Sequence, residues 1–350
     1  MKDSQNVKKK QETIKKEKSK HFRKKAVSAV IFEEKKKEPL LKKYENDLSL
    51  LFIPSILFIV LLILSLVNEH FLQEISHNQI LPLDTRTTLH PYPLVDGSIP
   101  FLNLSAKTAI VIDADSQVVV FSKNPELRFS MASTTKIMTA LTALDYYQPE
   151  SLLTVDARSV EGSMLGLQQG DTFYFIDLLY AMLLPSANDA AATIAANYPG
   201  GVEAFVAKMN EKAAALQLSN THFADPTGLE DDGDYTTVVD MAHLASFAIE
   251  NKQFTEVTGT KHKMITNVAK TNQYALSNLN KLLGVDGVTG IKTGTTEGAG
   301  EVLVTSTVAN GHTYIIVVMN SQDRFADTEM LLTFIAQNVR YIRPTLSNHF

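Results

Sequence analysis

A run of 20 residues without a charge, Leu48 to Val67, restricts the fold of this chain more than any other feature. It reads LSLLFIPSILFIVLLILSLV. A helix of about 20 apolar residues is long enough to cross the hydrocarbon core of a bilayer, and a kink at Pro54 is tolerated there. The sequence that follows has no clear signal-peptide cleavage site. We therefore predict a transmembrane helix at 48–67 rather than a buried globular helix or a removable leader.

The charge differs between the two sides of this run. Residues 1–47 contain 16 Lys and Arg against 8 Asp and Glu, whereas the rest of the chain contains 17 basic and 30 acidic residues. Such a lysine-rich segment is typical of a solvated tail, so no nucleic-acid partner is expected. Because the basic side of a membrane span stays in the cytoplasm, we expect a single-pass type II protein with a cytoplasmic tail at 1–47. Everything after Val67 is then extracellular.

The extracellular part is predicted to contain a linker and one folded domain. Residues 68–103 are polar and include four prolines, which interrupt helices and strands. Apolar residues make up 45% of the chain, enough for a substantial core. We place the folded domain at residues 104–345.

Metal and thiol chemistry find no support in the composition. The chain contains no cysteine, which excludes a thiol nucleophile, a disulfide framework and a cysteine-ligated metal. Its nine histidines show no HExxH or similar spacing. We therefore expect no metal and no other cofactor.

Strands are predicted near both ends of the domain. Thr108–Ser122 contains two β-rich runs and is typical of a hairpin. Residues 301–320 form two further β-rich runs, joined by Asn310-Gly311, which is a strong hairpin signal.

Helices are predicted between these strands and after them. The segment from about 133 to 250 is mostly helical, with helices at 175–184, 188–197 and 202–216, and a closing helix is expected at 327–341. The order of strands, helices, strands and helix favours an α+β fold. In this fold a mostly antiparallel sheet is flanked by a helical region, and the first hairpin joins the later strands.

The stretch MASTTKIMTA places Ser133 and Lys136 three residues apart. On a helix these positions lie on one face, so the amine reaches the hydroxyl. A serine is a poor nucleophile until a base takes its proton, and a lysine serves as that base when burial or a nearby cation lowers its pKa. The pair alone is weak evidence, because about one Ser-x-x-Lys is expected by chance in a chain of this length.

The stretch LLPSANDAA supplies a second pair, Ser186 and Asn188. Either side chain also suits the N-cap of the next helix. In a catalytic interpretation, Ser186 passes a proton to a leaving group, and Asn188 holds Lys136 and the substrate.

The stretch GIKTGTT places Lys292, Thr293 and Gly294 on a predicted strand. Lys-Thr-Gly is expected by chance in only about one chain in ten of this length. Glycine allows close approach to the strand, whose free edge then pairs with an extended peptide. The alternative is an edge strand with a protective lysine. Together, the three motifs in this order match the pattern of β-lactamases and penicillin-binding proteins.

Within that pattern, the sequence resembles the serine-type D-alanyl-D-alanine carboxypeptidases, the low-molecular-weight penicillin-binding proteins, which have a β-lactamase/transpeptidase-like fold. The resemblance covers about Leu104 to Arg340 and includes PSANDAA, THFADPTGLEDDGDYTT and GVTGIKTGTTEGAGEVLVTS. The family usually has glycine where this chain has Ala187, often asparagine in place of Asp225, and commonly tyrosine or arginine in place of Glu301. The last departure bears on fine substrate preference and not on the reaction.

The resemblance implies a bacterial cell-wall enzyme that removes the terminal D-alanine of peptidoglycan stem peptides and is acylated by β-lactam antibiotics. Ser133 would attack the carbonyl of the penultimate D-alanine, and Lys136 would accept its proton. The expected catalytic residues are Ser133, Lys136, Ser186, Asn188 and Lys292. The expected substrate-binding residues are Thr293, Gly294, Thr295 and Arg324.

Two of these roles need more detail. The backbone amides of Ser133 and Thr295 would form the oxyanion hole. Thr293 would bind the terminal carboxylate with help from Arg324, although a surface ion pair of Arg324 with Asp323 or Asp327 is an equally good interpretation.

Other functions remain open at this point. A D,D-endopeptidase would use the same residues. A class A β-lactamase is the nearest rival, but its Glu-x-x-Leu-Asn segment is missing between Asn188 and Lys292. A penicillin or muropeptide sensor without turnover and a scaffold with an inactive site are less favoured, because the three motifs are intact and no cytoplasmic effector domain is recognisable.

Many relatives carry a β-rich domain and a C-terminal amphipathic anchor after the catalytic domain. This chain ends shortly after its last predicted helix, so the anchor is expected at 48–67 instead. A fragment from about Asn68 onward is therefore expected to keep its activity.

Overall fold

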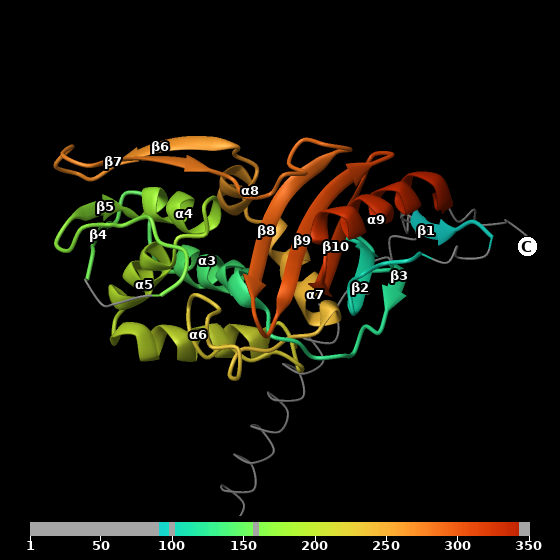
Figure 1. The fold of residues 1–350 in the computed structure, drawn as a ribbon, viewed down its shortest axis with the longest axis horizontal. Coiled ribbons are helices and arrows are strands. Elements are labelled where there is room, and N and C mark those ends of the chain that lie inside the picture. The colour runs from blue at the N-terminus through green and yellow to red at the C-terminus, as the bar shows by residue number, and fades with distance from the viewer. Residues whose placement is uncertain (1–90, 98–101, 157–160, 343–350) are drawn as a thin grey trace, which may run out of the picture. The chain divides into compact units, whose positions relative to one another are not determined.

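The computed structural model describes residues 91–97, 102–156 and 161–342, which all belong to one compact unit that spans Leu89–Phe350 (Figure 1). The predicted tail at 1–47 and the predicted transmembrane helix at 48–67 lie outside the described residues. Among the residues that are described, no helix has the length and apolarity needed to cross a membrane.

The unit is built on a five-stranded antiparallel sheet with the strand order β3-β2-β10-β9-β8. The first hairpin pairs with the later strands through β2 and β10, as predicted. The strands are β2 (Thr108–Asp113), β3 (Val119–Lys123), β8 (Val288–Thr296), β9 (Gly300–Ala309) and β10 (His312–Ser321).

The hairpin between β9 and β10 turns at the predicted Asn-Gly pair. Asn310 and Gly311 have φ angles of 53° and 79°. Two successive positive φ angles are what a tight two-residue hairpin turn needs, because they match the twist of the flanking strands. The turn chemistry therefore fixes the register of the two longest strands.

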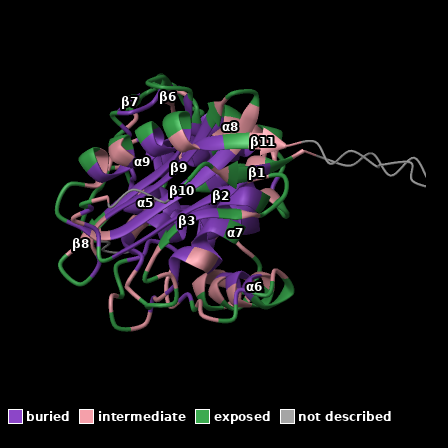
Figure 2. Ribbon diagram, turned by 90° about the vertical axis from the view of Figure 1, so that its right-hand side faces the viewer, coloured by how far each residue is buried: buried purple, intermediate pink, exposed green. Residues whose placement is uncertain are grey.

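The two faces of the sheet carry separate hydrophobic cores. Along β10, Ile315 and Val317 join the core shared with the helical region, whereas Ile316 and Val318 join the core under α9 (Arg324–Asn338). Figure 2 shows the central strands buried over most of their length. A strand covered on both faces is apolar at consecutive positions, which explains the unbroken runs TAIVID and YIIVVM.

The helical region begins at a short 3-10 turn, η1 (Ala132–Thr135), which leads directly into α3 (Lys136–Leu144). Every residue of α3 up to Ala143 is buried, and the helix packs against its helical neighbours on several sides. The helices predicted in the middle of the domain are confirmed. They are α4 (Phe175–Leu183), α5 (Asn188–Ala196) and α6 (Gly201–Ala215), followed by α7 (Val238–Ile249) and α8 (Lys252–Thr258).

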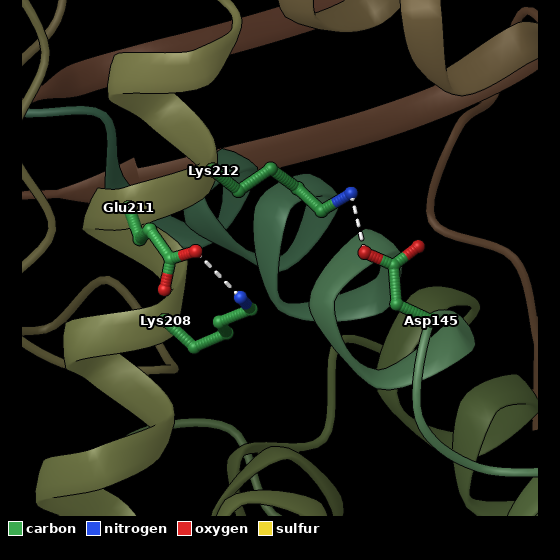
Figure 3. A network of polar contacts seen from close by, with 4 residues as sticks. All are labelled: Asp145, Lys208, Glu211 and Lys212. Carbon is green, nitrogen blue, oxygen red and sulfur yellow. Dashed lines mark hydrogen bonds and ion pairs between the residues drawn. The ribbon is translucent and has the colours of Figure 1, made fainter. Parts of the chain in front are cut away.

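An ion pair joins α6 to the C-terminal end of α3 (Figure 3). Lys212 Nζ lies 2.6 Å from Asp145 Oδ2, and one turn earlier on α6 Lys208 pairs with Glu211 at 2.7 Å. Ion pairs at a protein surface contribute about 0–1 kcal/mol each. The position of α3 is therefore determined mainly by its buried apolar side chains, and the ion pair adds orientation at its end.

Two small two-stranded antiparallel sheets were not predicted. They pair β4 (Leu152–Thr154) with β5 (Thr172–Tyr174), and β6 (His262–Thr266) with β7 (Gln273–Ser277). In β4 only the central residue is buried, and most of β6 is exposed. Strands with so little buried surface leave no clear alternating pattern in the sequence.

The predicted closing helix is wrong at both ends. It begins at Arg324, because the Asp323 side chain accepts the backbone N–H groups of Phe325 and Ala326 and caps it there. It ends at Asn338, where the chain becomes extended and forms β11 (Val339–Ile342).

β11 pairs with β1 (Tyr92–Val95), which lies inside the segment predicted as a linker without regular structure. Pro93 is accommodated because β1 is an outer strand of a two-stranded sheet, where a missing N–H is tolerated. Ordered structure therefore begins ahead of residue 104.

Candidate active site

Ser133 lies on η1, in a turn that holds it at the surface. Ala132 has a φ of +47°, which is unusual for a residue with a side chain. The backbone N–H and the hydroxyl of Thr134 both donate to Met131 O, at 3.1 and 2.5 Å respectively. Ala132 and Thr134 are buried, whereas Ser133 is only partly buried. The turn thus presents one hydroxyl from an otherwise buried segment.

Lys136 lies one turn further on, and its ammonium nitrogen reaches Ser133 as the spacing predicts. Its Nζ is 2.9 Å from Ser133 Oγ, 2.6 Å from Asn188 Oδ1 and 2.7 Å from Thr227 O. The side chain is completely buried. The first two motifs therefore meet at a single nitrogen atom.

The environment of Lys136 makes its ammonium acidic enough to lose a proton near neutral pH, so that the amine can act as a base. Burial lowers its pKa from the ordinary value of 10.5 to about 7, and the charges of Asp225 and Asp234 partly oppose this effect. Burial penalises the charged ammonium because water no longer solvates it. A substantial fraction of Lys136 is consequently neutral at physiological pH, as a proton acceptor requires.

In the second motif, Ser186 lies between α4 and α5 and Asn188 is the first residue of α5, and neither serves as the N-cap. The N-cap of α5 is Ala187, without a side-chain hydrogen bond. Asn188 uses its Oδ1 for Lys136 and donates from Nδ2 to Glu161 O at 2.7 Å. The capping alternative is therefore wrong, and Asn188 holds the amine.

Ser186 has two unusual properties. Its φ is +65°, and its buried hydroxyl has no hydrogen-bond partner among the described residues. Backbone strain and an unpaired buried hydroxyl both cost stability, and both concentrate at functional sites. The hydroxyl is free for a ligand or for a passing proton.

The third motif lies on β8, the edge strand of the five-stranded sheet. Lys292 is 1% exposed, so it is not a protective surface lysine, and its Nζ donates to Thr293 O at 2.9 Å. Burial holds the pKa of Lys292 well below its ordinary value, and the nearby charges of Lys136 and Arg324 add to this effect. The first and third motifs therefore lie within electrostatic range of each other.

Gly294 is the point at which β8 touches the serine turn. A Cβ atom on Gly294 would lie 3.0 Å from Ala132 Cβ and 3.1 Å from both Met131 O and Ser133 N. Only glycine allows the strand to approach this closely without displacing the turn. The contact brings the strand edge beside the backbone amide of Ser133.

Arg324 also belongs to this site. Its Nη1 donates to Gly294 O at 2.7 Å and to the hydroxyl of Thr295. Its backbone N–H donates to Glu301 Oε2 at 3.0 Å. The departure from the family pattern at Glu301 thus places an acidic group beside this guanidinium.

The ion pairs suggested as an alternative for Arg324 do not account for its position. Asp323 accepts hydrogen bonds from the first turn of α9 as its cap. Asp327 accepts from Ser105 and Ala106 instead. The guanidinium is directed at the third motif, beside the Thr293-Gly294-Thr295 strand.

Sequence reasoning missed the turn that supplies the third acceptor to Lys136. That acceptor is the carbonyl oxygen of Thr227, a main-chain atom with no side-chain signature. Gly228, with a φ of +82°, packs so tightly on the serine turn that a Cβ would lie 1.9 Å from Ala132 O. The Pro-Thr-Gly sequence at 226–228 was the available signal, because it is typical of a tight turn that needs glycine.

A search with family models finds the D-alanyl-D-alanine carboxypeptidases, peptidase family S11, over residues 96–323. This chain belongs to the D-alanyl-D-alanine carboxypeptidase family. The resemblance read from its motifs is confirmed.

Individual relatives agree with the family assignment. The chain is 33% identical over 242 residues to D-alanyl-D-alanine carboxypeptidase DacF of Bacillus subtilis, which covers 65% of this chain and 61% of the relative. It is 32% identical over 244 residues to a D-alanyl-D-alanine endopeptidase of Escherichia coli, covering 66% and 77%. The chain thus spans less than two thirds of the length of the Bacillus relative.

Solved structures in this family share the fold. The Streptomyces K15 DD-transpeptidase superposes with a TM-score of 0.64 at 29% sequence identity, covering 68% of this chain and 98% of that one. The predicted fold of an antiparallel sheet flanked by helices is therefore confirmed for the described unit.

Proposed function

We propose that this family member is a membrane-anchored serine D,D-carboxypeptidase of the bacterial cell wall. It removes the terminal D-alanine from peptidoglycan stem peptides through an acyl-enzyme on Ser133. The observation that carries the proposal is the contact of 2.9 Å between Ser133 Oγ and a fully buried Lys136 Nζ.

Acylation begins with the neutral form of Lys136. The lysine accepts the Ser133 proton while Oγ bonds to the carbonyl carbon of the penultimate D-alanine. Asn188 Oδ1 and Thr227 O hold the amine in place, so that its lone pair points at the serine. A positioned base of this kind contributes about 10²–10⁴-fold to the rate.

The developing negative charge is stabilised where β8 meets the serine turn. The backbone amides of Ser133 and Thr295 flank the contact that Gly294 makes possible, and together they supply the oxyanion hole. Removal of one such donor costs about 10²–10³-fold in other acyl-transfer enzymes.

The bond to the terminal D-alanine then breaks, and the departing nitrogen needs a proton. Ser186, whose hydroxyl is unpaired within the described part of the chain, relays the proton held by Lys136 to this nitrogen, helped by Lys292. The proton taken from Ser133 balances the one delivered to the amine. Water afterwards attacks the acyl carbon, and Ser133 leaves with its proton restored.

The substrate's terminal carboxylate is bound on the strand side. Thr293 provides its hydroxyl, and Lys292 and Arg324 provide positive charge. Because the free edge of β8 is available for strand addition, the stem peptide lies along it as an extended chain. Penicillins bind in the same place, acylate Ser133 and are hydrolysed slowly.

The decisive experiment incubates the full chain with a peptide ending in Lys-D-Ala-D-Ala and measures D-alanine release. Covalent labelling with a fluorescent penicillin is measured in parallel. We expect release and labelling in the wild type and neither in Ser133→Ala. Labelling without release indicates a sensor, and rapid penicillin turnover indicates a β-lactamase; either result contradicts the proposal.

A D,D-endopeptidase is a second candidate function, because a relative of similar identity carries that name. The same preparation, given a crosslinked muropeptide dimer, separates the two. Release of D-alanine from the monomeric peptide without cleavage of the dimer supports the carboxypeptidase.

The location of the enzyme is part of the proposal and is supported by sequence alone. The uncharged run at 48–67 and the basic tail at 1–47 favour a type II anchor with the catalytic unit outside the cell. Membrane fractionation tests this. We expect the full chain in the membrane fraction, and a fragment from Asn68 onward in the soluble fraction with its activity intact.

A further inference from the structure

The turn at 225–230 has a carboxylate at its centre that the proposed mechanism does not use. Asp225 Oδ1 accepts from Thr227 N at 2.5 Å, from Thr227 Oγ1 at 2.5 Å and from Gly228 N at 2.9 Å. Its Oδ2 accepts from Leu229 N at 3.0 Å and from Glu230 N at 2.9 Å. Because both oxygens accept, the turn is built for an ionised carboxylate. An asparagine would direct amide hydrogens at two backbone N–H groups.

One peptide group links this carboxylate to Lys136. The N–H of Gly228 donates to Asp225, and the carbonyl of the same peptide unit, Thr227 O, accepts from Lys136 Nζ at 2.7 Å. Hydrogen bonds in such a chain polarise one another. The charge on Asp225 therefore strengthens the hold of the peptide group on the lysine.

Asp234 places a second carboxyl group next to the first. It is 1% exposed, and its Oδ1 accepts from Ala224 N at 2.7 Å. Its Oδ2 is buried and receives no hydrogen bond from the described residues. An ionised oxygen in that position is unfavourable, whereas a protonated one donates to Asp225.

The electrostatics agree with a shared proton. Burial, the charge of Asp225 and a hydrogen bond between the two side chains raise the pKa of Asp234 to about 8. Burial opposes ionisation of Asp225 as well, but the hydrogen bonds from its own turn lower the pKa of that group overall. One member of the pair is thus protonated and the other ionised at neutral pH.

The charged groups that face Lys136 come from two sides. The loop between α6 and α7 contributes Asp225 and Asp234, which favour the ammonium. β8 contributes Lys292, and Arg324 on α9 lies beyond it. The Asp225–Asp234 pair therefore carries the negative charge that counteracts burial of the amine.

We propose that Asp225 and Asp234 are positioning residues for Lys136. They form a carboxyl–carboxylate pair that shares one proton, holds the Thr227–Gly228 peptide group against the lysine and sets the balance between ammonium and amine. The proposal rests on the proposed function in that Lys136 is taken as the base for Ser133. It assigns the Asp-Pro-Thr-Gly-Leu turn a role in tuning that base.

The test follows acylation of the full chain by a fluorescent penicillin between pH 5.5 and 9.5. The acylation rate rises with pH as Lys136 loses its proton, and we call this part of the profile the rising limb. Asp225→Asn removes the negative charge that favours the ammonium of Lys136, so the rising limb moves to lower pH by about one unit. The plateau also falls about tenfold, because the peptide group loses its anchor.

Asp234 is tested by a conservative and a disruptive variant. Asp234→Asn replaces the protonated acid by a neutral donor of the same shape, so the rate near pH 7 stays within about threefold of the wild type. Asp234→Ala removes both the donor to Asp225 and the acceptor of the Ala224 amide, and its rate falls about tenfold. Equal losses in the two variants contradict proton sharing.

Asp327→Asn is the matched control. Asp327 is also 1% exposed and accepts hydrogen bonds from Ser105, Ala106 and Ser321. Its substitution lowers stability but leaves the pH of the rising limb unchanged. If Asp225→Asn likewise lowers the rate by the same factor at every pH, the pair is only structural and the proposal is wrong.

Infrared difference spectroscopy gives a readout that does not need turnover. The difference spectrum of the wild type minus Asp234→Asn, recorded at pH 6, contains the C=O band of a protonated carboxylic acid. This band disappears as the pH passes about 8. Absence of this band overturns the proposal. A protein that labels normally but releases no D-alanine defeats the proposed function and leaves both of these readouts intact.

Discussion

The two buried lysines of the site differ in the polar and charged groups that surround them. Lys136, on the helical side, meets three oxygen acceptors and has two carboxyl groups nearby. Lys292, on the strand side, donates to a single carbonyl, and the charges that act on it are both cationic. Burial lowers the pKa of both, but only Lys136 has negative charges that hold its pKa near 7.

This difference separates their roles. An amine that exchanges its proton near neutral pH suits a base that must work in both directions. Burial and two nearby cations lower the pKa of Lys292, whereas the carboxylate of a bound substrate supplies a negative charge that favours its ammonium form. We infer that the helical side is prepared for proton transfer before binding, whereas the strand side is completed by the substrate.

The largest expected effect is the loss of the base. Lys136→Met keeps the volume of the side chain and removes the amine, so penicillin acylation falls about 10⁴-fold. Since Lys136 does not contact the carboxylate of the substrate, KM for the peptide changes little. Stopped-flow labelling measures the rate, and a thermal melt checks that the variant is folded. Acylation within tenfold of the wild type contradicts the assignment.

Removal of the strand-side lysine is expected to cost less and to act differently. Lys292→Met lowers kcat/KM for the peptide about 10²-fold, and part of this loss appears as a higher KM because the substrate carboxylate loses a cation. Steady-state kinetics with the Lys-D-Ala-D-Ala peptide separates the two parameters. If KM is unchanged and only kcat falls, the two lysines do not divide the work as inferred.

The contact between the two sides is tested at Gly294. Gly294→Ala introduces a Cβ 3.1 Å from Ser133 N, and the resulting shift of the turn lowers acylation about 30-fold. Gly290→Ala, on the same strand, is the matched control because its Cβ meets Thr258 Oγ1 at 3.0 Å instead. Similar losses in both variants indicate general damage to β8, whereas a loss confined to Gly294→Ala supports the close approach.

The smallest effect is the dependence of the wild type on pH. Lys136 has to be neutral to accept a proton, and its pKa is about 7, so acylation rises as the pH increases. Between pH 6 and pH 8 the neutral fraction increases about tenfold, and the rate follows it. The rate of penicillin labelling, measured across this pH range, tests this increase. A flat profile shows that Lys136 is not the titrating base.

Much of the site was predictable because its chemistry is in side chains at fixed spacing. Ser133 and Lys136 lie one helical turn apart, and Asn188 and Lys292 come from motifs whose order along the chain is informative. The fold was predictable for a similar reason, since the two-sided burial of β2 and β10 leaves unbroken apolar runs.

The rest depends on atoms that the sequence does not distinguish. The carbonyl of Thr227 is like any other main-chain oxygen until the turn at 225–230 brings it to Lys136. The unpaired hydroxyl of Ser186 results from a local backbone conformation. Short strands such as β4 bury too little surface to give a recognisable period.

The pairing of β1 with β11 places Tyr92 opposite Ile342. Residues directly opposed in an antiparallel ladder are about 5 Å apart, so both ends of the described unit open at one point on its surface. A short peptide suffices to join residue 92 to residue 342. The circular chain can then be opened at the Asn310-Gly311 turn, which contains none of the proposed site residues. The catalytic unit is thus suited to circular permutation and to insertion, as a module, into an exposed loop of another protein.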